Sequence, residues 1–202
     1  MRAIIFTGFI EGKIELFYKK QETDYLIGCD KGAILARQAG FKCNLVLGDF
    51  DTINQELINE KKITFPAEKD ETDTFIAVKE ALKLGFKEII ILGGLGGRFD
   101  HSYANILILE FLRKQNIKAK LIDEKNEVFI VSGEIKLLKT KKYLSVFSFS
   151  DNSMISAKGV KYPLDNTFLA KENPIGISNE IIEAEAIINV HKGVVLIVVS
   201  SD

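Results

Sequence analysis

Six aspartates stand at the predicted ends of strands or starts of helices: Asp30, Asp49, Asp51, Asp70, Asp73 and Asp100. In a parallel α/β sheet, such positions gather at the edge where the carboxyl ends of the strands lie and where ligands bind. Carboxylates gathered in this way repel one another unless a cation lies among them. Short carboxylates suit Mg²⁺, which takes the rest of its shell from water and phosphate oxygens. The pattern therefore predicts a Mg²⁺ and phosphate site at one sheet edge.

Individual aspartates also have local explanations. The segment Asp49-Phe50-Asp51 is equally typical of an Asx-turn at a strand end. Asp70 suits the N-cap of a helix, with Asp73 three residues on, where an acid favours the helix dipole. Capping and metal ligation are compatible, so these alternatives stay open. The convergence of all six carboxylates on one edge, which turn chemistry does not require, favours a shared site.

A glycine-rich segment follows a predicted buried strand and precedes a helix: Gly93-Gly94-Leu95-Gly96-Gly97-Arg98-Phe99-Asp100-His101. Four glycines let the main chain approach a ligand closely, and N–H groups beside a helix N-terminus favour an anion. The segment is neither a Walker A loop, since GxxxxGK[ST] is absent, nor a dinucleotide fingerprint, since Phe99 replaces its third glycine. Arg98 offers a planar guanidinium that matches a phosphate. The alternative is a tight turn with a solvated arginine.

The remaining ionisable residues are less informative. His101 suits a general base, a substrate-orienting group or a helix N-terminal hydrogen-bonding residue. His191 lies between strand-like runs near a Lys-Gly turn and is predicted at the surface. Lys31 and Lys69 each adjoin a candidate aspartate, where a lysine either contacts phosphate or forms a solvated pair. The sequence contains no recognisable Ser/His/Asp or Cys/His arrangement and no basic-aromatic stripe for RNA.

Alternating strand and helix signals fill the chain up to about residue 122. Strands are expected at 3–7, 25–29, 45–48, 63–65, 88–92 and 119–122. Helices are expected at 32–39, weakly at 53–61, at 74–84 and at about 102–114, with Gly40 and Gly85 as terminating glycines. Repeated strand-then-helix units predict a mostly parallel sheet that is covered on both faces.

The pattern changes after this point. Strand-like runs at 128–131, 143–149, 181–190 and 194–200 are separated by turn signals, and no helix is evident. Short strands with regular turns predict an antiparallel sandwich or barrel. We therefore expect an α/β fold in which a three-layer, mostly parallel α/β domain over 1–122 is followed by an antiparallel β-sandwich domain over 123–202.

Composition excludes several classes of protein. Of 202 residues, 47% are hydrophobic, 27 are Lys or Arg and 28 are Asp or Glu, so the formal net charge is −1. This balance gives no global basic field for nucleic acid or an anionic membrane, and the apolar content excludes global disorder. No run approaches the roughly 18 apolar residues of a membrane span, and no signal peptide is evident. Cys29 and Cys43 are expected to be core residues in a reducing compartment, which predicts a cytoplasmic location.

Six motifs resemble those of the thiamine pyrophosphokinase family in order and spacing. Four lie in the first part of the chain: Gly28-Cys29-Asp30-Lys31-Gly32-Ala33, Gly48-Asp49-Phe50-Asp51-Thr52, Lys69-Asp70-Glu71-Thr72-Asp73-Thr74, and the glycine-rich segment with Ala104-Asn105. Two lie in the second part: Gly159-Val160-Lys161-Tyr162-Pro163-Leu164 and Gly176-Ile177-Ser178-Asn179-Glu180. Each motif is short, but six in register over nearly the whole chain are highly specific.

The resemblance implies a homodimer, a Mg²⁺ cofactor and a reaction that converts ATP and thiamine into AMP and thiamine diphosphate. The thiamine hydroxyl attacks the β-phosphorus of ATP, and an aspartate accepts the proton. In such enzymes the thiamine site lies between subunits.

The resemblance also implies site residues. For ATP these are Asp30, Lys31, Gly93, Gly94, Gly96, Gly97, Arg98 and His101. For metal binding they are Asp49, Asp51 and Asp73, and for catalysis the same three with Asp100. For thiamine they are Asp70, Asp100, Tyr162, Ser178 and Asn179. Asp73 and Asp100 are the candidates for the proton acceptor.

Three positions depart from the family pattern. Tyr162 stands where the family usually has Trp, and a Tyr ring stacks on a thiazolium or pyrimidine with less area and a polar tip. Thr52 replaces the commoner Ser and keeps the hydroxyl group. Lys31 stands where Gly is frequent. The first departure concerns affinity for thiamine rather than the class of reaction.

Two other functions fit part of the pattern. One is the same transfer to another hydroxymethyl heterocycle, such as a pterin, for which Tyr162 and Ser178 line a different pocket. The other is a non-catalytic nucleotide sensor, although sensing does not require six carboxylates around a phosphate. A purely structural protein leaves the glycine-rich segment unexplained.

Overall fold

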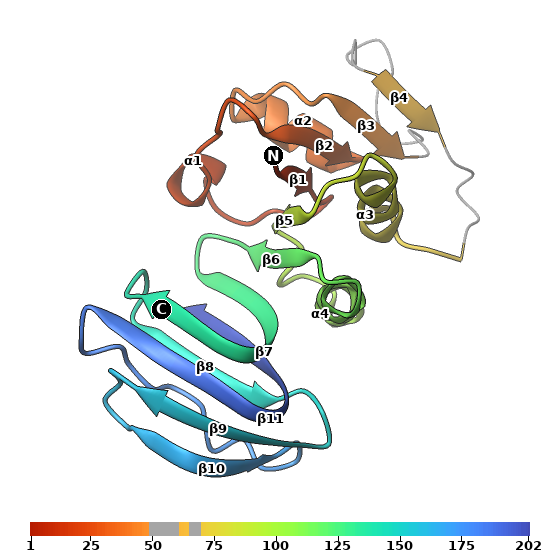
Figure 1. The fold of residues 1–202 in the computed structure, drawn as a ribbon. Coiled ribbons are helices and arrows are strands. Elements are labelled where there is room, and N and C mark those ends of the chain that lie inside the picture. Colours follow the sequence, from red (N-terminus) through yellow and green to blue (C-terminus); the bar gives the residue numbers. More distant parts are fainter. Residues whose placement is uncertain (49–60, 65–69) are drawn as a thin grey trace. The chain divides into compact units, whose positions relative to one another are not determined.

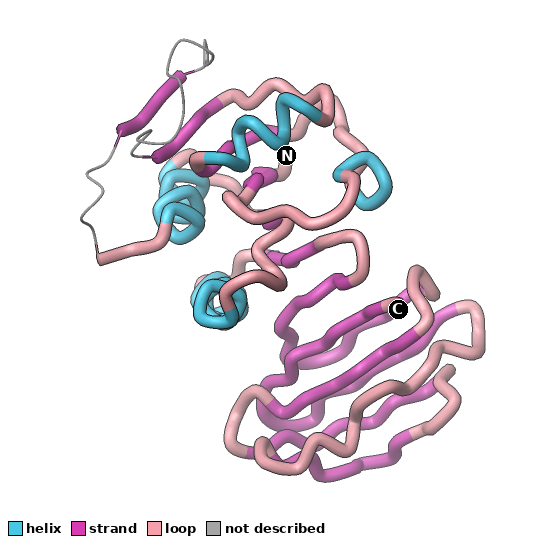
Figure 2. Tube along the Cα trace, turned by 180° about the vertical axis from the view of Figure 1, so that it is seen from behind, coloured by secondary structure: helices cyan, strands magenta, loops and turns pink. Residues whose placement is uncertain are grey.

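A computed structural model describes residues 1–48, 61–64 and 70–202. The chain forms two compact units, Met1–Glu124 and Lys125–Asp202. Among the described residues, helices occur in the first unit, while the second consists of strands and loops (Figure 2). The helix weakly predicted over 53–61 falls on residues outside this description, apart from Lys61, which begins a strand.

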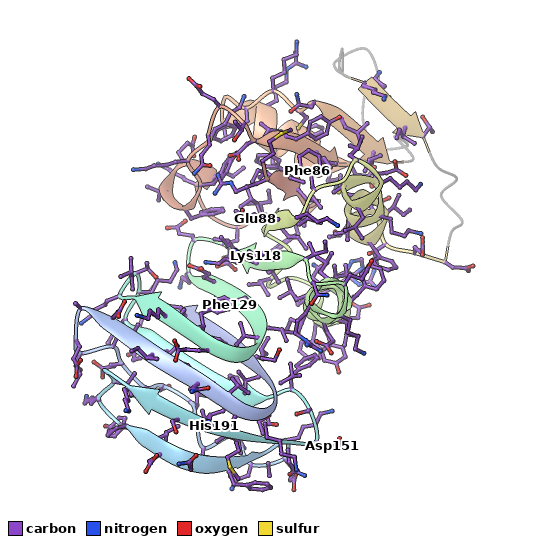
Figure 3. The ribbon with its side chains drawn as sticks, viewed as in Figure 1. Phe86, Glu88, Lys118, Phe129, Asp151 and His191 are labelled. Atoms are coloured by element: carbon purple, nitrogen blue, oxygen red, sulfur yellow. The ribbon has the colours of Figure 1, made fainter. Side chains whose placement is uncertain are left out.

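The first unit contains a parallel sheet. In pairing order its strands are β6 (Lys118–Ile122), β5 (Glu88–Leu92), β1 (Ala3–Phe6), β2 (Tyr25–Cys29), β3 (Leu45–Gly48) and β4 (Lys61–Thr64). All of these pairings are parallel. Figure 3 labels one pair in this register, Glu88 at the start of β5 and Lys118 at the start of β6. The mostly parallel sheet predicted from the sequence is confirmed.

Helices cover both faces of this sheet (Figure 1). Two lie on one side, α1 (Ile14–Phe17) and α2 (Lys31–Gln38), and two on the other, α3 (Asp73–Lys83) and α4 (Phe99–Lys114). The sequence gives no clear signal for α1, which has only four residues. No helix within the described ranges combines the length and the apolar character needed to cross a membrane.

The core is divided by the alternation of side chains along the strands. Ile4 and Phe6 of β1 pack in one cluster with residues of α1 and α2. Ile5, between them, points to the opposite face, which α3 covers, and is also fully buried. Because both faces are covered, β1 is apolar at every position instead of at alternate ones.

The start of α3 differs from the capping arrangement considered for Asp70. The N-cap is Thr72, whose hydroxyl oxygen accepts a hydrogen bond from the Phe75 N–H at 3.2 Å. Asp73 is therefore the first helical residue, and a cap at Asp70 is wrong. The sequence signal was ambiguous because threonine and aspartate are both good N-cap residues.

The ends of the other helices agree more closely with expectation. Gly40 and Gly85 follow α2 and α3 with φ of 81° and 85°, which is the left-handed conformation of a terminating glycine. Helix α4 begins at Phe99, three residues before its predicted start, with Arg98 as its N-cap residue. The glycine-rich turn thus leads directly into the first turn of α4.

The second unit is an antiparallel sheet of β7 (Asn126–Leu138), β8 (Tyr143–Ser148), β9 (Asn152–Lys158), β10 (Leu164–Ala170) and β11 (Glu185–Ser200). Strand β11 pairs with β7 on one side and with β9 and then β8 on the other, while β10 pairs with β9. A register shift after Val190 divides β11, and Gly193 has φ of 84° there. Phe129 of β7 is buried in the core of this unit (Figure 3).

Antiparallel strands were predicted for this half, and they are confirmed. The runs at 181–190 and 194–200, expected as two strands, contribute to one interrupted strand, β11. Strands β9 and β10 lacked a clear sequence signal because small and polar residues interrupt their apolar pattern.

A buried ion pair joins the amino ends of β1 and β2. The Asp24 carboxylate accepts hydrogen bonds from Arg2 Nε (2.9 Å) and Nη2 (2.8 Å), from the Tyr18 hydroxyl (2.9 Å) and from the Gln21 N–H (2.9 Å). Burial alone raises the pKa of Asp24, but these hydrogen bonds outweigh it and the pKa is lowered. The group therefore stabilises the fold as an anion, at the sheet edge opposite the carboxyl ends of the strands.

We predict that Asp24→Asn lowers the free energy of unfolding by about 1–3 kcal/mol at neutral pH, the usual value for hydrogen bonds to a charged group. Because the folded pKa lies below the ordinary 3.8, this stabilisation is complete above pH 3.8 and is lost as pH falls through the folded value. The variant and the wild type should therefore converge in acid. Urea unfolding at neutral pH and in acid measures both effects.

The matched control is Lys83→Gln, which removes an exposed ion pair with Glu80 in the same unit. We expect it to change the free energy of unfolding by less than about 0.5 kcal/mol. An equal effect of the two substitutions at neutral pH would contradict the role given to Asp24.

Candidate active site

A pocket of about 490 Å³ lies at the carboxyl ends of β1, β2 and β5. Its lining comes from residues 7–9, 29–31 and 72–74 and from Gly94, Gly96, Arg98, His101 and Asn105. Strand order reverses at this place, because the chain passes from β1 outward to β4 and then places β5 on the other side of β1. Loops that leave two such neighbouring strands diverge and open a crevice, where ligands of α/β proteins bind.

The glycine-rich turn forms one wall of this pocket. Gly93 and Gly94 have φ of 76° and 74°, which residues with a Cβ rarely adopt. The Gly94 N–H donates to the Phe9 oxygen at 2.7 Å, and a Cβ on Gly93 would lie 2.3 Å from that same oxygen. The Asn105 side chain donates from Nδ2 to the Gly94 oxygen at 2.9 Å. The glycines expected to allow a close approach thus bring the turn against the loop after β1.

That loop contributes site residues that the sequence did not single out. The Thr7 hydroxyl lies 2.8 Å from the Phe9 oxygen and 3.0 Å from the Leu92 oxygen, so it links the ends of β1 and β5. The Phe9 ring covers the glycine-rich turn, because a Cβ on Gly97 would lie 3.2 Å from it. The only hint in the sequence was a Thr-Gly pair directly after an apolar strand.

Two predicted carboxylates line the pocket, Asp30 and Asp73. Asp30 lies between β2 and α2 with φ of 46°, and its Oδ1 lies against Gly48 at the end of β3, where a Cβ would be 1.8 Å away. Asp73 opens α3 on the opposite face of the sheet. Lys31 follows Asp30 and also lines the pocket. The structure therefore brings together residues of the first and third motifs.

Of the other predicted aspartates, the structure describes only Asp70 and Asp100, and neither lines this pocket. Asp49 and Asp51 fall outside the described residues. Asp70 lines a separate and mainly apolar hollow of about 310 Å³, together with residues such as Phe75 and Phe111. Asp100 is exposed at the start of α4. The described part of the structure thus places two of the six aspartates in one pocket.

Arg98 and Asp100 form an ion pair at the rim of this pocket. Arg98 donates from Nε and Nη2 to the two carboxylate oxygens at 3.1 and 2.5 Å, and the His101 N–H donates to Oδ1 at 3.0 Å. These hydrogen bonds, those from Arg98 foremost, lower the pKa of Asp100, and the carboxylate raises that of Arg98. Both side chains are exposed, so the pair holds the guanidinium in place without burying it.

The donor chemistry of the pocket suits a divalent cation. Asp30 and Asp73 supply hard oxygen ligands, and the Asp30 carboxylate lies beside Gly48, which directly precedes Asp49 in the sequence. Within the described ranges, no three His, Cys, Asp or Glu side chains are grouped closely enough to hold a metal.

The second unit carries the remaining candidates in two adjacent loops. The Asn179 side chain accepts from the Tyr162 N–H at 3.0 Å and donates to the Tyr162 oxygen at 2.7 Å. Ser178, with φ of 57°, precedes Asn179. The sixth motif is therefore bound to the fifth, although Ser178 comes 16 positions after Tyr162 in the sequence.

Comparison with known proteins matches both units. The model of the thiamin pyrophosphokinase catalytic domain matches residues 18–121, and that of the thiamin pyrophosphokinase vitamin B1 binding domain matches residues 132–195. A thiamine pyrophosphokinase of Bacillus subtilis is 34% identical over an alignment of 188 residues, and the match covers 87% of this chain and 87% of that protein.

The chain belongs to the thiamine pyrophosphokinase family.

Solved structures agree with this membership. A crystal structure of thiamine pyrophosphokinase from Bacillus subtilis superposes with a TM-score of 0.91 at 29% identity, over the whole of both chains. One from Geobacillus thermodenitrificans gives 0.87 at 26% identity, over 100% of this chain and 98% of that one. The family resemblance, the two-part α/β and β fold and the class of enzyme predicted from six short motifs are therefore confirmed.

The candidate site residues fall within the ranges of two different family models. Asp30, Asp73, Arg98 and Asn105 lie in the range of the catalytic-domain model, and Tyr162 lies in that of the vitamin B1 binding domain. The pocket residues after β1 lie before residue 18, outside both ranges.

We predict that Gly94→Ala weakens the binding of ATP at least about tenfold. Its Cβ would lie 2.4 Å from Asn105 Nδ2, so the pocket wall must move in addition to the strain of a positive φ. The control is Gly85→Ala, at a φ of 85°, where an added Cβ meets nothing within 4 Å. Isothermal titration of both variants with ATP and Mg²⁺ separates backbone strain from displacement of the turn, and equal affinities would contradict the role given to Gly94.

Proposed function

We propose that this chain transfers pyrophosphate from ATP to the hydroxyl group of thiamine, giving thiamine diphosphate and AMP. The observation that carries the proposal is the pocket at the reversal of strand order. There Asp30, Asp73 and Arg98 surround a glycine-rich turn, in a chain of the thiamine pyrophosphokinase family. Such a pocket combines acidic ligands for a cation with a cationic and main-chain surface for phosphate.

The phosphates of ATP bind against the glycine-rich turn and the N-terminus of α4. Arg98, the N-cap residue of this helix, makes no side-chain capping hydrogen bond. The positive end of a sixteen-residue helix therefore adds to the charge of the guanidinium. Lys31 and His101 line the same pocket, which supports their assignment to the nucleotide.

Enzymes of this class generally need a divalent metal ion, and Mg²⁺ is the ion we expect here. Asp73 would hold it together with Asp49 and Asp51, while Asp30 lies beside the end of β3 from which the latter two follow. When bound, Mg²⁺ neutralises negative charge on the phosphate oxygens.

The transfer step needs positioning and one proton acceptor. The thiamine oxygen forms a bond to the β-phosphorus, and the bond between this phosphorus and the oxygen bridging it to the α-phosphorus breaks, leaving its electron pair on AMP. The hydroxyl proton passes to a carboxylate. Asp73 suits this role better than Asp100, since Asp73 lines the pocket, whereas Asp100 is exposed and accepts two hydrogen bonds from Arg98. Asp100 instead orients Arg98.

Thiamine meets the Tyr162 ring and the Ser178 hydroxyl of the second unit. The Tyr162 residue is 59% exposed, with Lys161 Nζ 5.7 Å from the ring centroid, so the ring offers exposed area for stacking on a cationic heterocycle. The family resemblance supports a homodimer in which these residues serve the pocket of the partner copy.

We predict that the purified chain with ATP, Mg²⁺ and thiamine forms AMP and thiamine diphosphate in equal amounts. Chromatographic separation of AMP from ADP, with and without thiamine, measures this. Formation of ADP would mean γ-phosphoryl transfer and contradict the mechanism. ATP binding without turnover would favour a nucleotide sensor, and turnover with a hydroxymethyl pterin instead of thiamine would favour that substrate class.

We predict that Asp73→Asn lowers kcat by about a hundredfold or more, because the substitution removes both a metal ligand and the proton acceptor. Asp100→Asn should chiefly raise KM for ATP, since it frees Arg98 from its fixed orientation. Steady-state kinetics on both variants test the assignment, with circular dichroism to confirm the fold. A larger loss of kcat in Asp100→Asn would reverse the two roles.

We predict that mixing two inactive variants restores activity if each site uses both copies of a dimer. One chain carries Asp73→Asn and the other Tyr162→Ala. Random assortment gives about half mixed dimers with one intact site of two, hence about a quarter of wild-type activity. Activity is measured after the chains are unfolded and refolded together. No recovery from a mixture that does form dimers would place each site within one chain.

A further inference from the structure

The loop that carries Ser178 is bound along the edge of β8. The Val146 N–H donates to the Gly176 oxygen at 2.9 Å. Leu144 and Asn179 exchange two main-chain hydrogen bonds, of 2.7 and 3.0 Å. A Cβ on Gly176 would lie 2.2 Å from the Val146 oxygen, so glycine is required for this approach. The loop therefore behaves as a short additional strand and not as a free connection.

Ser178 has an unusual backbone conformation within this loop. Its φ of 57° lies in the left-handed region, which non-glycine residues seldom adopt. The Ser178 N–H donates to the hydroxyl oxygen of Ser145 on β8 at 3.0 Å, and Ser145 is itself buried. A strained residue that its surroundings hold in place is a recurrent feature of functional sites.

The loop that carries Tyr162 is bound to the segment after Ser178. The Lys161 N–H donates to the Glu180 oxygen at 2.9 Å, and the Ile182 N–H donates to the Gly159 oxygen at 3.0 Å. At Tyr162 the main-chain groups are bound by a side chain instead. Asn179 makes two hydrogen bonds there, one to the Tyr162 N–H and one to the Tyr162 oxygen.

The side-chain amide of Asn179 has little capacity left for a ligand. Its Oδ1 accepts from two main-chain N–H groups, those of Tyr162 at 3.0 Å and Glu180 at 2.9 Å. Its Nδ2 donates to the Tyr162 oxygen at 2.7 Å. An amide oxygen has two lone pairs and an amide nitrogen two hydrogens, so one N–H remains. The amide thus connects two loops instead of facing a substrate.

We propose that Asn179 and Ser145 are positioning residues of the thiamine site, and that neither binds thiamine itself. Asn179 fixes the main chain of Tyr162, and Ser145 holds Ser178 in its left-handed conformation. The aromatic ring and the hydroxyl are then presented to the substrate at a set separation. The proposal rests on the proposed function, which assigns Tyr162 and Ser178 to thiamine, and it replaces the expectation that Asn179 contacts thiamine directly.

The first test uses an introduced indole as a reporter. The chain has no tryptophan, so Tyr162→Trp supplies a single indole, which can be excited selectively over the remaining tyrosines, at the position where the family usually has this residue. In that background, Asn179→Ala should lower the steady-state fluorescence anisotropy of the indole. Unchanged anisotropy would overturn the proposal for Asn179, whether or not the chain is active.

The second test is kinetic and uses the natural Tyr162. Asn179→Ala should raise KM for thiamine about tenfold or more while KM for ATP stays within about twofold, because the ring loses its fixed position and the nucleotide pocket is untouched. A general loss of structure would instead lower kcat and affect both substrates. Equal KM values for thiamine in variant and wild type would overturn the proposal.

The matched control is Glu180→Gln. It removes the exposed Lys161–Glu180 ion pair, which joins the same two segments, but leaves the amide of Asn179 in place. We expect unchanged anisotropy and an unchanged KM for thiamine. An effect as large as that of Asn179→Ala would mean that any loosening of these segments suffices, which contradicts a specific role for Asn179.

Ser145→Ala keeps the test informative if Asn179→Ala does not fold. It removes one hydroxyl and the acceptor of the Ser178 N–H. We expect KM for thiamine to rise several-fold, and Ser145→Thr, which keeps the hydroxyl oxygen, to retain more affinity than Ser145→Ala. No change in Ser145→Ala would overturn the role of Ser145. Absence of thiamine diphosphate with the wild-type chain would overturn the proposed function, while the anisotropy result still decides whether Asn179 holds residue 162.

Discussion

The pocket depends on one close contact between main chains, that of the glycine-rich turn with the loop after β1. The hydrogen bond from the Gly94 N–H to the Phe9 oxygen is 2.7 Å long, and the space around Gly93 leaves no room for a Cβ. The turn can therefore lie across the ends of β1 and β5 and carry Arg98 to the pocket. A bulkier turn would move away from β1 and take the N-terminus of α4 with it. The reversal of strand order supplies the crevice, and the glycines supply its wall.

The two arginine–aspartate ion pairs of the first unit differ in their exposure to solvent. Arg98 is paired with Asp100, but both side chains are exposed, and ion pairs in water contribute little to stability. The guanidinium therefore stays exposed to a phosphate ligand while Asp100 orients it. The buried Arg2–Asp24 pair differs, because its carboxylate accepts four hydrogen bonds and exchange would leave a charge uncompensated. The buried pair stabilises the fold, and the exposed pair orients a guanidinium at the rim of the pocket.

Patterns in the sequence predicted what depends on local rules. The parallel strands, the two helices followed by Gly40 and Gly85 and the glycine-rich turn all follow from apolar runs and backbone preferences. What the sequence did not reveal depends on tertiary contact. Thr7 and Phe9 are ordinary residues that gain a role only because β5 lies beside β1. Asp70 and Asp73 are three residues apart, yet they line different hollows, and the N-cap residue Thr72 between them lines both.

The two units share a way of fixing their loops. In the first, the neutral amide of Asn105 holds the Gly94 oxygen, and the Thr7 hydroxyl joins the loop after β1 to the end of β5. In the second, the amide of Asn179 holds Tyr162, and the Ser145 hydroxyl holds Ser178. Amides and hydroxyls satisfy main-chain groups where no strand or helix does so. They also add no net charge beside a site that handles phosphates and a cationic heterocycle. A lysine or glutamate in the same place would shift the pKa of neighbouring carboxylates and compete for the substrate. Neutral side chains therefore supply these hydrogen bonds to the main chain, alongside the exposed Lys161–Glu180 ion pair that joins the same two loops of the second unit.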